Sequence, residues 1–308
     1  MALHQLRSIT IGVPDPEPVA QYYEEFGLER SEDTVLSTTE GGRQLFLETA
    51  PTRRLVQLVV GVDDQDDLDR VRSSLEAGDH PVTVDATSIS AVETHSGVRV
   101  VLEVSPRASL PVIEEPRYNG PGAPERVDAR APGVLRDGRV RPRKLGHVVF
   151  TTTNFGATND FFTSHVGFKI SDYIGDIGVF LRCSTDHHNV LVLEAPATFL
   201  HHSAWQVDDI DEIGRGASAL LEGHPERHVW GLGRHHAGSN FFWYLRDPAG
   251  NYSEYYSDLD YIPEQATWVP ETAAGKFGLY NWGPEPPPSF VAPDDLMELL
   301  EAQRAIAI

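Results

Sequence analysis

Residues 201–223 read HHSAWQVDDIDEIGRGASALLEG, an apolar strand-like run that passes through Val-Asp-Asp into an amphipathic helix closed by a glycine. The same order of apolar strand, polar turn and amphipathic helix occurs in residues 6–28, 55–78 and 145–168. Residues 55–78 match best, since they too pass through Val-Asp-Asp and end at Leu-Glu and a glycine. The Asp pair suits the N-cap and the positive end of the helix dipole, and the glycine suits the left-handed residue that closes a helix.

Short strand-like stretches follow each helix, for example residues 98–104 (VRVVLEV) and 241–245 (FFWYL). The repeated unit is therefore one strand, one helix and about three further strands, over roughly fifty residues. Four such βαβββ units predict an α+β fold. A chain of 308 residues with 40% apolar content is long enough to bury two cores, so we expect two domains.

The repeats also predict the domain boundaries. We expect an N-terminal domain at residues 1–105 and a C-terminal domain at residues 144–262. Residues 106–143 are rich in Pro, Gly and Arg and predict a linker. Residues 263–308 form a tail whose prolines exclude a central strand or helix until Pro-Asp-Asp opens a last helix at 296–305. An oligomer contact and a flap over the functional site are both open as roles for this tail.

Composition narrows the class of protein. The net charge is −21, from 46 acidic and 25 basic residues, which disfavours binding to nucleic acid or to an anionic membrane. The single Cys183 excludes an internal disulfide and suits a reducing cytosol. The sequence shows no signal peptide and no apolar run near the roughly 18 residues of a spanning helix. We therefore expect a cytoplasmic protein.

Three residues in the second half have the composition of a metal site. The runs KLGHVVF and LHHSAWQV place His147 and His202 on predicted strands, and the last strand of the half contains Glu254. Two imidazoles and one carboxylate make up the facial triad that holds non-haem Fe(II) with open positions. Because side chains on a strand alternate between its faces, we expect only one of His201 and His202 to face the metal.

Alignment of the two halves supports His202 as the ligand. His202 precedes its Val-Asp-Asp by five residues, as Gln57 does in the first half. The first half has Ser8, Gln57 and Glu103 where the second has His, His and Glu. Ten of the thirteen histidines also fall between residues 147 and 236. The sequence therefore predicts one metal site per chain, in the second half.

The runs KLGHVVF and LHHSAWQV, together with GRH before an aromatic strand and RDPAGN after it, resemble the catalytic half of type I extradiol dioxygenases of the vicinal oxygen chelate superfamily. The resemblance covers residues 4–262. It implies two domains, each of paired βαβββ modules forming an open barrel-like cup. It implies these roles: metal binding by His147, His202 and Glu254, acid–base catalysis by His188, and hydrogen bonds to substrate or intermediate from His235 and Tyr244.

The resemblance further implies Fe(II), with Mn(II) in some relatives, and a homo-oligomer, for which a tetramer is favoured. The expected reaction is cleavage of the aromatic ring of a catechol-type substrate by O2. Arg182, Arg234 and Arg246 are available partners for an anionic ring substituent, so the choice of catechol stays open. Two alternatives remain: a glyoxalase- or epimerase-like isomerase, whose sites often use two carboxylates, and a non-catalytic protein that binds an aromatic ligand.

Overall fold

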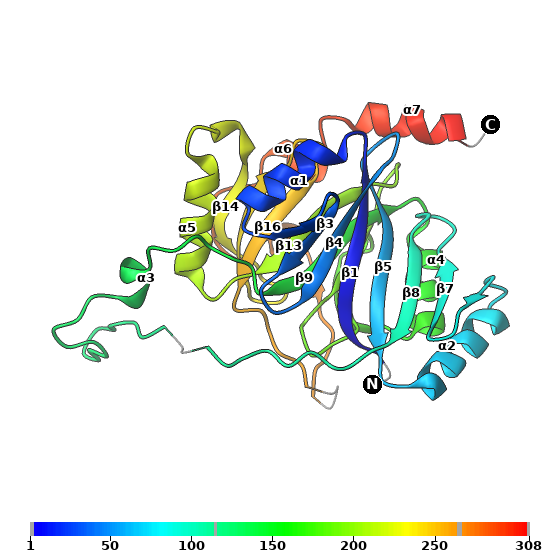
Figure 1. Ribbon diagram of the computed structural model, residues 1–308, viewed down its shortest axis with the longest axis horizontal. Coiled ribbons are helices and arrows are strands. Elements are labelled where there is room, and N and C mark those ends of the chain that lie inside the picture. Colours follow the sequence, from blue (N-terminus) through cyan, green and yellow to red (C-terminus); the bar gives the residue numbers. More distant parts are fainter. Residues whose placement is uncertain (1–2, 114–115, 264–266, 307–308) are drawn as a thin grey trace.

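The computed structural model describes residues 3–113, 116–263 and 267–306, and these form two mixed sheets with helices packed against them (Figure 1). The first half contains β1 (Leu3–Val13), α1 (Pro16–Glu25), β2 (Glu29–Glu32), β3 (Val35–Thr38), β4 (Gly42–Thr49), β5 (Arg54–Val62), α2 (Gln65–Ala77), β6 (Thr83–Val84), β7 (Ser88–Val92) and β8 (Arg99–Val104). Its eight strands are ordered β2-β3-β4-β1-β5-β8-β7-β6.

The second half repeats this arrangement. It contains β9 (Lys144–Thr152), α4 (Phe155–Asp160) with a π-helical continuation (Phe161–Val166), β10 (Lys169–Ile174), β11 (Gly178–Arg182), β12 (Val190–Glu194), β13 (Leu200–Gln206), α5 (Ile210–Leu221), a 3-10 turn (Pro225–Arg227), β14 (His228–Arg234), β15 (Phe241–Arg246) and β16 (Tyr252–Ser257). The nine-stranded sheet has the order β14-β15-β16-β13-β9-β12-β11-β10-β17, where β17 (Thr272–Ala273) comes from the tail.

Strand pairing shows how the modules are joined. In each sheet the first strands of the two modules, β1 with β5 and β9 with β13, pair antiparallel at the centre. Each of these four strands also pairs in parallel with the last strand of its own module. The predicted fold of paired βαβββ modules is therefore confirmed, and the strands that carry the predicted metal ligands lie next to one another.

The Val-Asp-Asp segments cap their helices as predicted. Asp64 accepts a hydrogen bond from the backbone N–H of Asp67 at 3.0 Å, and Asp209 does the same from Glu212 at 3.0 Å. The prediction of a left-handed closing glycine is correct for Gly223, with φ of 78°, but wrong for Gly78, with φ of −89°. After α2 the left-handed residue comes one position later, at Asp79, with φ of 59°.

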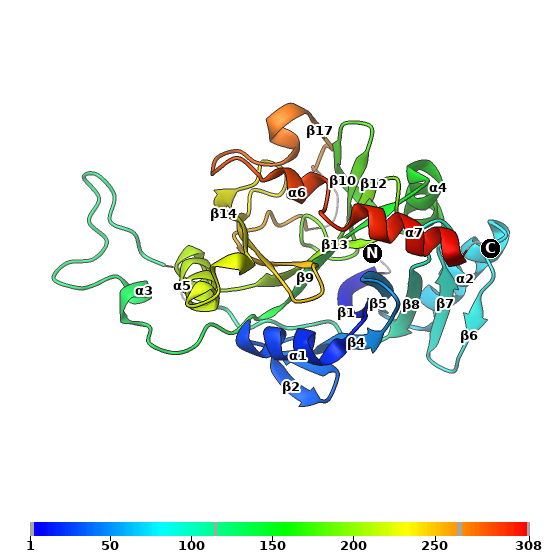
Figure 2. The ribbon, with the colours of Figure 1, turned by 90° about the horizontal axis from the view of Figure 1, so that it is seen from above.

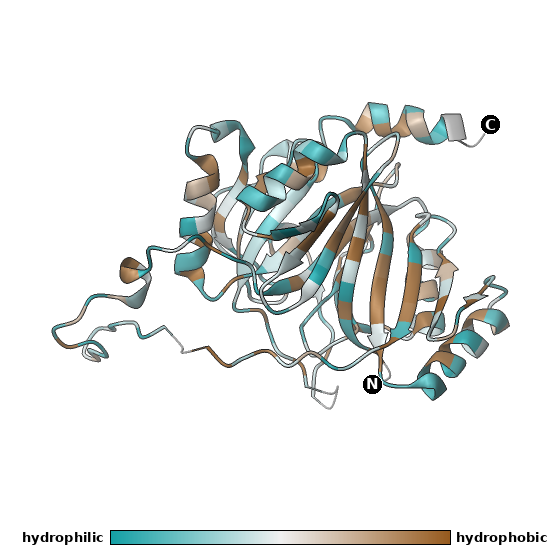
Figure 3. Cartoon of the chain, viewed as in Figure 1, coloured by the Kyte–Doolittle hydropathy of each residue, from teal (hydrophilic) through white to brown (hydrophobic). Residues whose placement is uncertain are grey.

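The two halves share one hydrophobic core, which contains residues of both sheets. Helix α1 of the first half packs on strands of the second: the Tyr23 hydroxyl hydrogen-bonds with the Ser203 hydroxyl at 3.0 Å, and Phe26 stacks on Tyr255 with ring centroids 3.8 Å apart. Figure 3 shows hydrophobic residues running along the central strands and hydrophilic residues along much of α1 and α2. The first half thus packs against the sheet that carries the predicted metal ligands.

The linker and the tail differ in how closely they follow this body. Much of the linker extends away from the sheets, with one short helix, α3 (Pro132–Leu135) (Figures 1 and 2). The tail instead adds β17 in parallel to the edge strand β10 and continues through a 3-10 turn (Gly275–Gly278), α6 (Pro288–Val291) and α7 (Leu296–Ile306), as predicted for the last helix. Figure 2 shows α6 and α7 lying over the strands. Among the described residues, no helix combines the length and apolar character needed to cross a membrane.

Candidate metal centre

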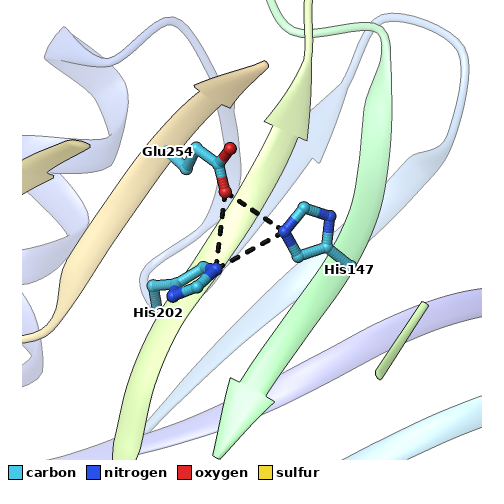
Figure 4. Close-up of side chains that lie close together, drawn as sticks. All are labelled: His147, His202 and Glu254. Carbon is cyan, nitrogen blue, oxygen red and sulfur yellow. Dashed lines mark hydrogen bonds and ion pairs between the residues drawn. The ribbon is translucent and has the colours of Figure 1, made fainter. Parts of the chain in front are cut away.

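The predicted metal ligands come together on three adjacent strands, β9, β13 and β16 (Figure 4). Ala204 on β13 is paired with His147 on one side and with Glu254 on the other, so these residues form one row across the sheet. His202 lies two positions before Ala204 and therefore projects from the same face. All three ligand residues are buried, with exposures of 4% or less.

The distances within this cluster fit a metal ion. Glu254 Oε2 lies 3.1 Å from His147 Nε2 and 3.4 Å from His202 Nε2, and the two nitrogens are 3.4 Å apart. Ligand atoms about 2.1 Å from a common ion lie roughly 3.0–3.4 Å apart at right to tetrahedral angles. The donor set is also the one that non-haem Fe(II) sites use. The residues present therefore fit a divalent ion held from one side.

The protonation states also suit a metal. Burial alone raises the pKa of Glu254, but attraction to and hydrogen bonds with the two histidines outweigh it and hold the pKa well below its usual range. Burial lowers the pKa of His202 to about 4, against the opposing effect of Glu254. Glu254 is thus a carboxylate and His202 a neutral imidazole at neutral pH, which are the forms that bind a metal.

Of the two adjacent histidines, His202 belongs to the ligand group and His201 does not, as expected, but the placement of His201 on the opposite face, which strict alternation predicts, is wrong. The pairing of β13 with β9 shifts register between Leu200 and His202, and this bulge lets both histidines line the same cavity. His201 Nε2 lies 2.6 Å from the carbonyl oxygen of Phe290, and its Nδ1 lies 2.7 Å from Nδ1 of His202.

The contact between the Nδ1 atoms of His201 and His202 fixes the tautomer of His202. A carbonyl oxygen only accepts, so His201 carries its proton on Nε2, and burial lowers its pKa to about 3, which keeps the ring neutral. Nδ1 of His201 is therefore an acceptor, and Nδ1 of His202 is the donor. The lone pair of His202 is left on Nε2, facing Glu254 and His147, where a cation would satisfy all three groups.

The three predicted catalytic residues surround this cluster. The ring centroid of His188 lies 4.2 Å from that of His147. Burial holds the pKa of His188 well below its usual value, so the ring is neutral. His235 donates from Nδ1 to the carbonyl of Leu279, so its Nε2 accepts from the hydroxyl of Tyr244 at 2.9 Å. The structure thus brings all six predicted site residues to one place.

Asn240 is a residue of the site that the sequence did not reveal. Its amide donates to Glu254 Oε1 at 3.1 Å, so it holds the carboxylate with Oε2 toward the histidines. The side chain is fully buried. Asn240 lies in the short loop between β14 and β15, and a polar residue in a loop carries no pattern that distinguishes this role from a turn.

Five of the six residues, all but Glu254, line a cavity with an empty volume of about 970 Å³, which includes the solvent space at its open mouth. Its wall beyond the metal centre is mainly apolar and includes Val149, Ile174, Ile177, Phe180, Leu191, Leu193, Phe199, Leu279, Phe290 and Val291. The last three residues belong to the tail, so the tail forms part of the wall. Whether the tail also makes a subunit contact stays a prediction.

None of the three arginines predicted as partners for an anionic substituent lines this cavity. Arg182 donates to the Ile170 carbonyl and to the Ser171 hydroxyl, Arg234 pairs with Asp258, and Arg246 pairs with Asp294. Among the described residues of the wall, the charged side chain outside the histidine and carboxylate cluster is Glu194. An anionic substituent would therefore find no positive partner here.

The corresponding place in the first half has different chemistry. Ser8 is paired with Val59, and Gln57 lies two positions before it, as predicted from the alignment. The partner of Val59 on β8 is Val101, so Val101 takes the place of Glu254 and the predicted match with Glu103 is two residues off. Glu103 forms an ion pair with Arg7 at 2.6 Å. A guanidinium thus satisfies this carboxylate.

Comparison with known proteins agrees with the fold. Residues 144–255 match the family model of the Glyoxalase/Bleomycin resistance protein/Dioxygenase superfamily. Metapyrocatechase 2 of Cupriavidus necator is 39% identical over 156 residues, which are 50% of this chain and 48% of that protein. Manganese-dependent 2,3-dihydroxybiphenyl 1,2-dioxygenase of Geobacillus genomosp. 3 is 30% identical over 161 residues, 48% of this chain and 51% of that protein. The chain spans about half the length of these curated relatives.

Solved structures match over nearly the whole chain. The Mn(II)-bound glyoxalase from Novosphingobium aromaticivorans has a TM-score of 0.70 and 26% identity, and covers 92% of this chain and 93% of its own. The 2,2',3-trihydroxybiphenyl 1,2-dioxygenase from Sphingomonas wittichii has a TM-score of 0.69 and 19% identity, with 92% and 100% covered. The second likeness is one of fold alone.

Proposed function

We propose that this chain, whose residues 144–255 form a domain of the Glyoxalase/Bleomycin resistance protein/Dioxygenase superfamily, is a metal-dependent extradiol dioxygenase that cleaves the ring of a catechol with O2. The observation that carries this proposal is the cluster of two imidazole nitrogens and one carboxylate oxygen, open on its cavity side, with His188 beside it. The names of the curated relatives support the same reaction.

Fe(II) is the proposed ion, because two histidines and one carboxylate with open positions are typical of non-haem iron oxygenases. His147, His202 and Glu254 would hold the ion, which would supply a Lewis-acidic, redox-active site for the catechol and O2. Mn(II) is the second candidate, since one relative is named manganese-dependent and one similar structure is bound to Mn(II).

The protein groups handle the protons. Neutral His188 is placed to accept a phenolic proton of the catechol and to return it to the ring-opened product, so it ends each turnover unchanged. Burial raises the pKa of Tyr244 far above 10, so its hydroxyl stays protonated. That hydroxyl donates to His235 Nε2 here, and it would turn from His235 to donate to a developing oxyanion on bound substrate. Both atoms of O2 enter the product as one ring C–C bond breaks.

The wall of the cavity favours a neutral catechol with an apolar substituent, such as an alkyl or phenyl group. Burial of such a group contributes about 25 cal/mol per Å² of apolar area. A carboxylate in the same place would lose its hydration without an ionic partner, and Glu194 would repel it. Catechols with an anionic side chain should therefore be poor substrates.

We also propose that residues 144–262 carry the chemistry, that residues 1–105 support them, and that the chain assembles as a homo-oligomer. A metal-dependent isomerase is the second candidate function, favoured by the similarity to the Novosphingobium glyoxalase structure. The presence of a single buried carboxylate in the cluster argues against it, since such isomerases often use two.

The deciding experiment is anaerobic reconstitution with Fe(II) or Mn(II), followed by oxygen uptake and visible absorbance with a panel of catechols. We expect one O2 consumed per catechol and a yellow ring-opened product, fastest for 3-methylcatechol or 2,3-dihydroxybiphenyl. A fully metal-loaded protein that consumes no O2 with any catechol but isomerises a hemithioacetal would overturn the proposal in favour of the isomerase.

A further inference from the structure

We infer that Asp172 and His187 form a hydrogen-bonded relay that positions the proton of His188, so that its Nε2 meets the substrate as a bare base. The inference rests on the proposed function, in which His188 moves the phenolic proton. Asp172 and His187 do not line the cavity, so their role is one of positioning.

The relay is continuous and closed to water. His187 Nε2 lies 2.9 Å from Asp172 Oδ2, and His187 Nδ1 lies 3.0 Å from His188 Nδ1. The exposures are 7% for Asp172, 0% for His187 and 4% for His188. The rings of Phe180 and Trp268 pack edge-on against His187. They offer no acceptor that could compete for its ring nitrogens.

One end of the relay sets the position of each proton. The backbone N–H of Glu271 donates to Asp172 Oδ1 at 2.7 Å, so Oδ2 is the oxygen that faces His187. A carboxylate only accepts, so His187 carries a proton on Nε2, and in the neutral ring its Nδ1 is then bare. His188 must then donate from its own Nδ1. Its Nε2 keeps the lone pair, and no hydrogen bond from a described residue occupies it.

The second histidine doublet has the same arrangement. His201 and His202 also meet through their Nδ1 atoms, and the Nε2 of His201 is fixed by the Phe290 carbonyl. In both doublets the first histidine is anchored by an acceptor and the second presents a bare Nε2 to the site. In both, the tail takes part, through Glu271 in one case and Phe290 in the other. This repetition argues that the doublets are built to set tautomers.

Asp172 also stabilises the protonated form of His188 during turnover. When His188 accepts a proton on Nε2, it becomes a cation in a buried setting, and its Nδ1–H already points toward His187. The carboxylate of Asp172 at the far end of the relay stabilises that charge, as a buried carboxylate does for a histidine base elsewhere. No net proton leaves the relay, so the cycle closes when His188 returns its proton to the product.

Asp172→Asn tests the relay, because the backbone N–H of Glu271 fixes how the new amide is oriented. The amide oxygen must stay at the Glu271 N–H, which turns the NH2 group toward His187 Nε2. His187 is then forced to carry its proton on Nδ1, and His188 must move its proton to Nε2, the wrong position for a base. We expect kcat to fall about 10²–10⁴-fold, with KM and bound metal unchanged.

Asp172→Ser is the matched control. It is smaller and leaves room for a water that can accept from His187 Nε2, so we expect a milder loss than for the isosteric Asn. A purely structural role predicts the opposite order, since Asn preserves the shape. His187→Asn, whose side-chain oxygen can replace the acceptor Nδ1, should likewise exceed His187→Leu in kcat.

Nitrogen-15 NMR of the imidazoles provides a measurement that does not depend on activity. In the full chain loaded with diamagnetic Zn(II), His188 should show a protonated Nδ1 and a bare Nε2, and the two should exchange roles in Asp172→Asn. A wild-type His188 protonated on Nε2, or an unchanged tautomer in Asp172→Asn, overturns the relay. If the tautomers switch as expected but no catechol is cleaved by the iron-loaded wild type, the relay stands and the proposed dioxygenase function fails.

Discussion

Replacing His201 with Phe should weaken metal binding although His201 is not a ligand. His201 Nδ1 is the acceptor, at 2.7 Å, that keeps the proton of His202 on Nδ1. In His201→Phe this acceptor is lost, and the metal-free protein gains by moving the proton of His202 to Nε2, where Glu254 Oε2 lies 3.4 Å away. A metal must reverse that shift before it can bind.

The expected loss of metal affinity follows from the N–H group of His202 that loses its acceptor. With the metal bound, Nδ1–H of His202 stays buried and unpaired in the variant, and an unpaired buried donor costs about 1–3 kcal/mol. Since about 1.4 kcal/mol corresponds to a tenfold change, the metal should bind about 5- to 150-fold more weakly. The lower end of this range applies if a water reaches Nδ1.

The assay is competition for Fe(II) or Mn(II) against a chelator of known affinity, with the melting temperature of each variant as a check on folding. His201→Asn is the matched control, because its side-chain oxygen can accept from His202 in place of the imidazole nitrogen. We expect Asn to bind close to the wild type and Phe to bind weakly. Equal affinities for Phe and wild type would show that His201 only fills space and would refute the tautomer argument.

Three further predictions concern the centre and its selectivity. Glu254→Ala should lose bound iron and activity together, as should alanine variants of the two histidine ligands, and a fully iron-loaded Glu254→Ala protein would exclude the triad. His188→Ala should keep its metal while kcat falls about 10²–10⁴-fold, and a variant with unchanged kcat would remove His188 from the acid–base role. Ile177 lines the cavity and is 53% exposed, so Ile177→Arg places a cation in the cavity wall. We expect the kcat/KM for a carboxylated catechol to rise relative to that for 3-methylcatechol. A constant ratio would mean that Ile177 lies too far from the ring substituent.

Much of the fold could be predicted because the signals that set it are local. An apolar strand, an Asp or Asn cap and a glycine after the helix recur in each module, with Val-Asp-Asp itself in the second and fourth. Strand alternation then determines which face His147 and Glu254 present. The same logic misassigned His201, because it assumes a regular strand. The register shift between Leu200 and His202 depends on pairing with β9, and the residues of β13 give no sign of it.

The parts of the site that the sequence did not predict come from distant segments of the chain. Phe290 and Leu279 reach the histidines through backbone carbonyls, and a carbonyl is present at every residue, so composition and spacing cannot mark it. The two-residue error at Glu103 has a similar origin: an alignment along the chain cannot detect a change in loop length that the sheet register absorbs, and the register places Val101 opposite Val59.

Arg53 links the first half of the chain to the site in the second half. This residue belongs to the first half, yet it is only 4% exposed and its guanidinium donates to the Leu200 carbonyl, next to His201. It also forms a two-pronged ion pair with Asp295 of the tail, at 2.6 and 2.8 Å. One buried guanidinium therefore ties the strand that bears the second histidine doublet to the tail segment whose Phe290 carbonyl anchors it. Because the first half supplies this connection, and helix α1 packs behind the same sheet, the first half can contribute to the site without a metal of its own.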